Sequence, residues 1–140
     1  VSPDGTSGGW HEGMFSMASA EKRARIVCEL RAKRACVLYA RIVPKNAVGA
    51  VAIPERARGD FASAIRKTTS GRFAAFAING LGGYGFGSNF ADLREAQQRA
   101  KLECEASSAR DKAKADATRR SAFEKAGLYT CQLIHSVRKR

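Results

Sequence analysis

Residue types that build catalytic centres are scarce in this chain of 140 amino acids. It has two histidines, and neither His11 nor His135 lies in an H-E-x-x-H motif or near a serine elbow. No carboxylate pair suited to acid–base chemistry and no Walker lysine is visible either. A lone histidine is usually an ordinary surface or core residue. We therefore expect no enzymatic activity and no cofactor.

Long apolar runs and metal-ligand spacings are also missing. No stretch of 18 apolar residues occurs, and the uncharged stretch 73–91 contains five glycines, so we expect no membrane span. The four cysteines include no C-x-x-C pair, and the two histidines do not lie at ligand spacing from one another. The sequence therefore predicts no metal site.

Acidic residues are few compared with basic ones. The chain has 25 Lys and Arg against 13 Asp and Glu, and the excess is larger in residues 21–72 than in residues 92–140. Such a charge favours anionic partners without choosing among them. The run in the first half that we expect to bind an anionic partner comprises Lys22, Arg23, Arg25, Arg31, Lys33 and Arg34. A solvated face without a partner is the alternative interpretation.

The cysteines lie in two similar sequence contexts. The segment ARIVCE at 24–29 aligns with AKLECE at 100–105, and CVL at 36–38 aligns with CQL at 131–133. We interpret them as two copies of one unit, in which a helix ends near a cysteine and a later cysteine opens a strand. The repeat implies two disulfides, Cys28 with Cys36 and Cys104 with Cys131.

Sequence alone leaves the cysteine state open, because four cysteines allow three connectivities and free buried thiols are a further alternative. An even number of cysteines is compatible with an oxidising compartment. The chain begins with VSPDGTSGGW instead of Met, and we expect a processed product that is periplasmic or secreted.

Apolar spacing predicts the elements of the first half. A helix is expected over 16–29, with Ser16 or Ser19 near its N-cap, and a short helix or turn over 60–68. Strands are expected at 36–43, 47–53 and 71–79. In the last of these, Phe73 and Phe76 should lie on opposite faces.

The glycine-rich stretch AINGLGGYGFGSNF, residues 77–90, predicts a β-hairpin. Its returning strand has glycines where another element must approach closely. Gly80, Gly82 and Gly85 also satisfy G-x-G-x-x-G, but the next helical pattern begins only near Asp92, which is too late for a dinucleotide-binding turn. We therefore expect a hairpin and no nucleotide loop.

A helix capped by Asp92 is expected to reach Cys104 and to continue as a charged helical insertion at about 105–126. Gly127 should end it before a last strand. The insertion lacks an apolar stripe, so we expect either a solvated helical hairpin arm or a helix that docks a partner. The basic residues of this arm are Arg110, Lys112, Lys114, Arg119 and Arg120.

The segment 71–137 resembles a family of small secreted bacterial domains of unknown function. The resemblance implies export, a bridge between Cys104 and Cys131 and a small α/β unit, and it brings no catalytic residues. The link between these cysteines, 27 residues here, is longer than in the family. The matching positions are Ala75, Ala77, Gly83, Tyr84, Gly85, Ala96, Ala100, Cys104 and Cys131.

We expect an α+β fold with a small, mainly antiparallel sheet and two Cys-terminated helices packed on one of its faces. Residues 1–12 should be irregular, and residues 13–140 should form a single domain. That domain would consist of two related units, at about 13–44 and 71–137, with the helical insertion in the second.

The expected function is that of an exported, disulfide-stapled, non-catalytic binding or accessory protein. Its basic face and helical arm would dock an acidic protein or an anionic polymer at the cell envelope. A nucleic-acid-binding or ribonucleoprotein subunit is the alternative, with Tyr84 and Phe86 stacking on bases beside the basic patch.

Overall fold

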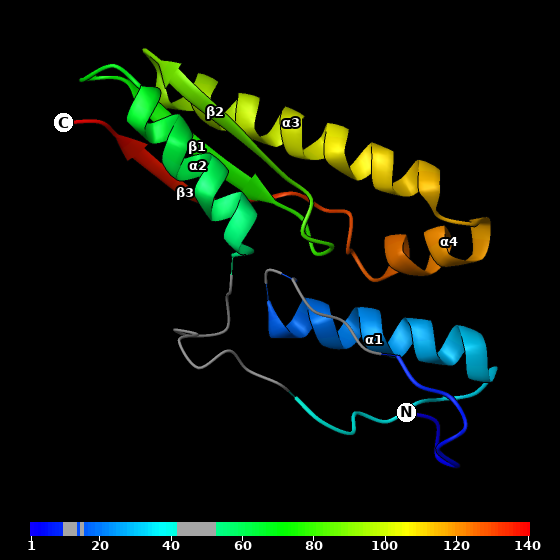
Figure 1. The fold of residues 1–140 in the computed structure, drawn as a ribbon. Coiled ribbons are helices and arrows are strands. Elements are labelled where there is room, and N and C mark those ends of the chain that lie inside the picture. Colours follow the sequence, from blue (N-terminus) through cyan, green and yellow to red (C-terminus); the bar gives the residue numbers. More distant parts are fainter. Residues whose placement is uncertain (10–13, 15, 42–52) are drawn as a thin grey trace.

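The computed structural model describes residues 1–9, 14, 16–41 and 53–140. A three-stranded antiparallel sheet with the strand order β2-β1-β3 forms its centre (Figure 1). The mixed α+β class is therefore confirmed. None of the helices among the described residues is long and apolar enough to cross a membrane. The elements are α1 (Met17–Ala32), α2 (Glu55–Lys67), β1 (Phe73–Ile78), β2 (Tyr84–Phe90), α3 (Leu93–Lys114), α4 (Ala117–Lys125) and β3 (Gln132–Arg138).

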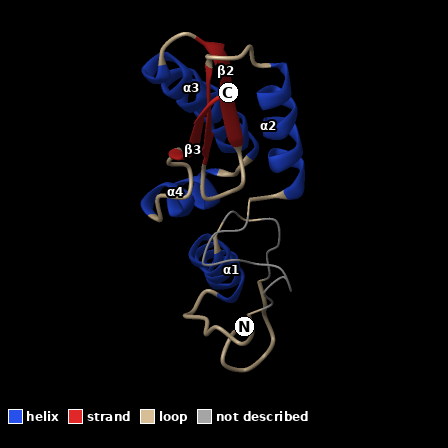
Figure 2. Ribbon diagram, turned by 90° about the vertical axis from the view of Figure 1, so that its left-hand side faces the viewer, coloured by secondary structure: helices blue, strands red, loops and turns tan. Residues whose placement is uncertain are grey.

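Helices cover both faces of the sheet, with α2 on one and α3 on the other (Figure 2). Alternation along the central strand β1 produces the two cores: Phe76 and Ile78 pack toward α2, whereas Phe73 and Ala75 pack toward α3. The prediction that Phe73 and Phe76 lie on opposite faces is confirmed.

Two glycines of β2 let α3 lie directly on the sheet. A Cβ atom added to Gly85 would overlap the backbone of Cys104 and Ala100, and one added to Gly87 would overlap the carbonyl oxygen of Ala96. The helix side of this contact is built from small residues, so its backbone approaches the strand closely. The glycine-rich strand therefore has the close approach that the sequence predicts.

The hairpin between β1 and β2 is held by one buried side chain, Asn79. Its amide oxygen accepts hydrogen bonds from the backbone of Leu81 (2.9 Å) and Gly83 (2.8 Å), while its Nδ2 donates to Ser108 Oγ of α3 at 2.6 Å. The hydroxyl of Ser108 in turn donates to the carbonyl oxygen of Tyr129 at 3.0 Å. The network therefore ties the turn, α3 and the approach to β3 together.

Replacing Asn79 with alanine is expected to lower the free energy of unfolding by about 2 kcal/mol, because two turn amides and the Ser108 hydroxyl lose their buried partner. Chemical denaturation of the purified variant measures this loss. Ser107→Ala, a change of a partly exposed hydroxyl one residue from Ser108, is the control and should stay within about 0.5 kcal/mol of the original protein. A loss at Asn79 no larger than the control would contradict this role.

Helix α2 begins earlier than the sequence predicts. It starts at Glu55, after Pro54 at the N-cap position, and Asp60 lies inside the helix. The buried residues Ala57, Phe61 and Ala64 follow a helical spacing and pack on the sheet. The expected start near residue 60 is wrong because this apolar stripe extends the helix one turn earlier.

Helix α1 does not pack on the sheet, contrary to our expectation of two Cys-terminated helices on one face. Its partner is α4, because Phe123 of α4 lies in a separate core with Leu128 and Tyr129, against which Ile26 and Val27 of α1 pack. The expected helical insertion is present as the end of α3 and as α4. It is packed on α1 and is not a free arm.

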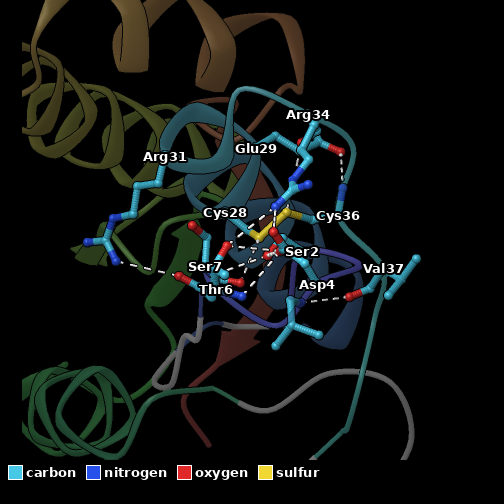
Figure 3. Close-up of a disulfide and its surroundings, with 12 residues drawn as sticks. Ser2, Asp4, Thr6, Ser7, Cys28, Glu29, Arg31, Arg34, Cys36 and Val37 are labelled. Atoms are coloured by element: carbon cyan, nitrogen blue, oxygen red, sulfur yellow. Dashed lines mark hydrogen bonds and ion pairs between the residues drawn. A yellow bond between two sulfur atoms is a disulfide. The ribbon is translucent and has the colours of Figure 1, made fainter.

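Residues 1–9, which contain no helix or strand, fold against the end of α1 (Figure 3). The N-terminal amine donates to the carbonyl oxygen of Val37 at 2.8 Å, and the Val37 amide donates to the carbonyl oxygen of Val1 at 2.9 Å. The predicted strand at 36–43 is wrong over 36–41, because no strand of the sheet lies beside this segment. Most of the strand expected at 47–53 lies outside the described residues.

Both expected disulfides are present, which confirms the pairing. Cys28 is bonded to Cys36 with a Cα–Cα distance of 6.2 Å, and Cys104 is bonded to Cys131 with 6.1 Å. The first bridge joins α1 to the segment after it, and the second joins α3 to the residue before β3. The two related units remain a prediction.

Candidate anion-binding surface

Six basic residues lie at one end of the sheet. Because β1 and β3 are antiparallel, the start of β1, the end of β3 and the end of α2 lie together there (Figure 1). The amide of Lys139 donates to the carbonyl oxygen of Arg72 at 2.9 Å, and that of Gly71 donates to the carbonyl oxygen of Lys139 at 2.8 Å. We call this surface the basic end, and its residues are Arg66, Lys67, Arg72, Arg138, Lys139 and Arg140.

Backbone carbonyl groups, not carboxylates, hold three of these side chains. Arg138 Nε donates to the Gly71 oxygen at 3.1 Å, Lys139 Nζ to the Arg66 oxygen at 2.7 Å, and Arg72 Nη1 to the Asn89 oxygen at 3.2 Å. None of the ion pairs found among the described residues includes a member of the basic end. Carbonyl groups fix the side chains without cancelling their charge.

The loop that joins α2 to β1, residues 68–72, lies next to the basic end and is held by hydrogen bonds. Gly71 has a φ of +82°, and the Thr69 amide donates to Asn89 Oδ1 at 2.9 Å. Asp92, an acidic residue that follows β2 at this end, accepts hydrogen bonds from the first amides of α3. Its carboxylate therefore caps a helix instead of pairing with the basic end.

Guanidinium and ammonium groups are positively charged donors, so the basic end can attract and bind carboxylate, phosphate or sulfate groups. Among the described residues, no group of three or more potential metal ligands occurs. The positive charge of the basic end suits the binding of anionic groups.

The basic residues in and just after α1, which the sequence predicted to bind an anionic partner, have different environments. Lys22 donates to the carbonyl oxygen of Ala126 at 3.4 Å, and the guanidinium of Arg23 lies 5.7 Å from the Phe123 ring, where burial lowers its pKa. Arg34 forms an ion pair with Asp4. Several of the expected binding residues thus make contacts within the molecule.

The remaining members of that run are exposed. Arg31 donates to the carbonyl oxygen of Gly8 at 3.5 Å, whereas Arg25 has no ion pair or hydrogen bond within the described part of the chain. Lys33 and Arg31 join Arg119 of α4 in a groove of about 280 Å³ between the two helices. Asp116 lines the same groove and is 3.7 Å from Arg119, which reduces its positive charge.

Three of the five basic residues of the expected arm, Lys112, Arg119 and Arg120, have partners within the fold. Lys112 pairs with Glu124 at 2.8 Å and lies 5.1 Å from the Tyr129 ring. Arg120 Nη2 donates to the Ala115 oxygen at 2.9 Å. Arg110 and Lys114 are exposed, and no partner is found for them among the described residues.

The two aromatic residues of the nucleic-acid alternative belong to the core beneath α2. The Tyr84 ring stacks on Phe76 with 5.9 Å between centroids, and its hydroxyl donates to Asp60 at 2.5 Å. Burial, and then this hydrogen bond, raises the pKa of Tyr84. Phe86 packs against the same core. Neither ring is a free platform for a base.

Sequence reasoning missed the basic end as a surface. Its residues come from three separate segments, and only the pairing of β1 with β3 brings them together.

No protein-family model, no curated protein and no solved structure matches this chain.

Proposed function

We propose that this chain is an exported, disulfide-stapled, non-catalytic binding protein that docks an acidic partner at the cell envelope through its basic end. The observation that carries the proposal is a set of six cations without carboxylate partners among the described residues. Two disulfides fit an oxidising compartment. The packing of α4 on α1 argues against the helical arm as the main docking element.

The proposal predicts that neutralising the basic end weakens binding to an acidic polymer. The variant carries Arg66→Gln, Lys67→Gln and Arg140→Gln, whose side chains make no hydrogen bond or ion pair among the described residues. Its affinity for poly-L-glutamate should fall about tenfold, because fixed positive charge is lost at the docking surface. The salt dependence of binding should become shallower. Titration by fluorescence anisotropy at several salt concentrations measures both.

The matched control carries Arg25→Gln, Arg110→Gln and Lys114→Gln, which remove the same net charge from exposed positions elsewhere. Its affinity should change less than about twofold. An equal loss in both variants would show that net charge, and not the basic end, attracts the polymer. Tighter binding of a single-stranded RNA than of poly-L-glutamate at equal salt would favour the nucleic-acid alternative.

A further inference from the structure

The outer edge of β3 is open. In the order β2-β1-β3 this strand pairs only with β1, and no strand in the described part of the chain lies beyond it. The backbone of Lys139 bonds toward β1, and hydrogen bonds of an antiparallel ladder alternate along the strand. The amide and carbonyl groups of Ser136 and Arg138 therefore point to the free edge.

The other edge of the sheet is less suited to pairing. In β2, Asn89 has a φ of +67°, and the register with β1 shifts between Phe73 and Ala75. Such irregularities interrupt a regular edge. The β3 ladder has its own shift where it faces Phe76 and Ala77, so its regular edge runs from His135 to Lys139.

A groove lies beside the open edge. Helix α3 packs mainly over β2 and β1, which leaves a hollow of about 420 Å³ between the helix and β3. Leu102 is 52% exposed there, and it is the only large apolar side chain exposed on a helix among the described residues. Leu133 of β3 also contributes apolar surface, and Gln97 Nε2 donates to Ser136 Oγ at 3.3 Å.

The charges along this groove select an acidic occupant. Arg94 and Lys101 line it against a single carboxylate, that of Glu105, and the basic end continues it beyond Arg138. A polypeptide supplies the alternating donors and acceptors that an open strand edge requires, whereas a polysaccharide or a nucleic acid does not.

We infer that the partner is an extended acidic polypeptide that adds to β3 as a fourth strand. This inference rests on the proposed function and gives the acidic partner its chemical class. The strand's backbone pairs with Ser136 and Arg138, and its apolar side chains cover Leu102 and Leu133. Its carboxylates lie near Lys101, Arg94 and the basic end.

The test uses a capped nine-residue peptide in which glutamate alternates with valine. Ser136→Pro removes the edge amide, while the inward amides of β3 keep their bonds to β1. Ser136→Ala is the matched control, because it loses the same hydroxyl and keeps the amide. The dissociation constant should rise at least tenfold in the proline variant and less than about threefold in the alanine variant.

A second measurement needs no variant. In the original protein the peptide should slow the hydrogen exchange of the Ser136 and Arg138 amides, while a peptide N-methylated at alternate residues should not. Lys101→Glu should weaken peptide binding more than Lys125→Glu, since only the first faces the groove.

The outcomes separate the two proposals. Peptide binding that is lost on neutralising the basic end, but is affected equally by proline and alanine at position 136 with no slowed exchange there, overturns the added strand and leaves the proposed function standing. Binding of neither the peptide nor poly-L-glutamate at low salt overturns both.

Discussion

Gly85→Val is expected to lower the free energy of unfolding by at least about 3 kcal/mol, because the new side chain needs space that the backbone of α3 occupies. The atoms in the way are the amide nitrogen of Cys104 and the carbonyl oxygen of Ala100, neither of which can rotate aside. Valine therefore lifts α3 from the sheet and opens the core around Ala77. For a chain of this length, thermal unfolding should shift downward by about 10 °C, which circular dichroism measures.

Gly59→Ala is the control for this substitution. Gly59 is exposed inside α2, and a Cβ atom there has no neighbour within 4 Å. Alanine should stabilise the protein by about 0.5–1 kcal/mol, since it favours the helix. If Gly85→Val unfolded at the same temperature as the original protein, the close contact between α3 and β2 would be refuted.

Local signals in the sequence predicted the second half of the fold well. The hairpin, the Asp92 cap, the stop at Gly127 and the strand after Cys131 are all present. Each rests on neighbouring residues whose backbone preferences act over a few positions. The close approach at Gly85 was also predictable. Glycine weakens a strand, so a glycine-rich strand indicates that another backbone approaches it closely.

What the sequence could not reveal depends on contacts between distant segments. The apolar residues of α1 suit any apolar surface, and only the position of Phe123 directs this helix to α4 instead of the sheet. Residues 36–41 have strand-forming side chains, yet no strand edge lies beside them. The basic end is missed for the same reason, since Arg66 and Arg138 are distant in sequence and meet through the sheet.

Removing the bridge between Cys104 and Cys131 by a double alanine substitution is expected to destabilise the protein by roughly 3–4 kcal/mol. The bonded cysteines are 27 residues apart, and the entropy that a cross-link removes from the unfolded chain grows with loop length. Cys104 is fully buried between α3 and the sheet, so its loss also loosens the core. Denaturant unfolding of the purified double variant measures the change.

The matched comparison is the double substitution Cys28→Ala and Cys36→Ala. It removes a bridge whose cysteines have a sequence separation of only 8. From the entropy that this bridge removes from the unfolded chain, we expect its loss to destabilise the protein by about 2.5 kcal/mol. Removing the bridge should speed amide hydrogen exchange mainly at the end of α1 and in residues 1–9, which pack beside it. Hydrogen exchange in the sheet should stay slow. A larger loss of stability from this short loop than from the long one would mean that α1 and its N-terminal cover, and not the sheet with α3, form the most stable part of the molecule.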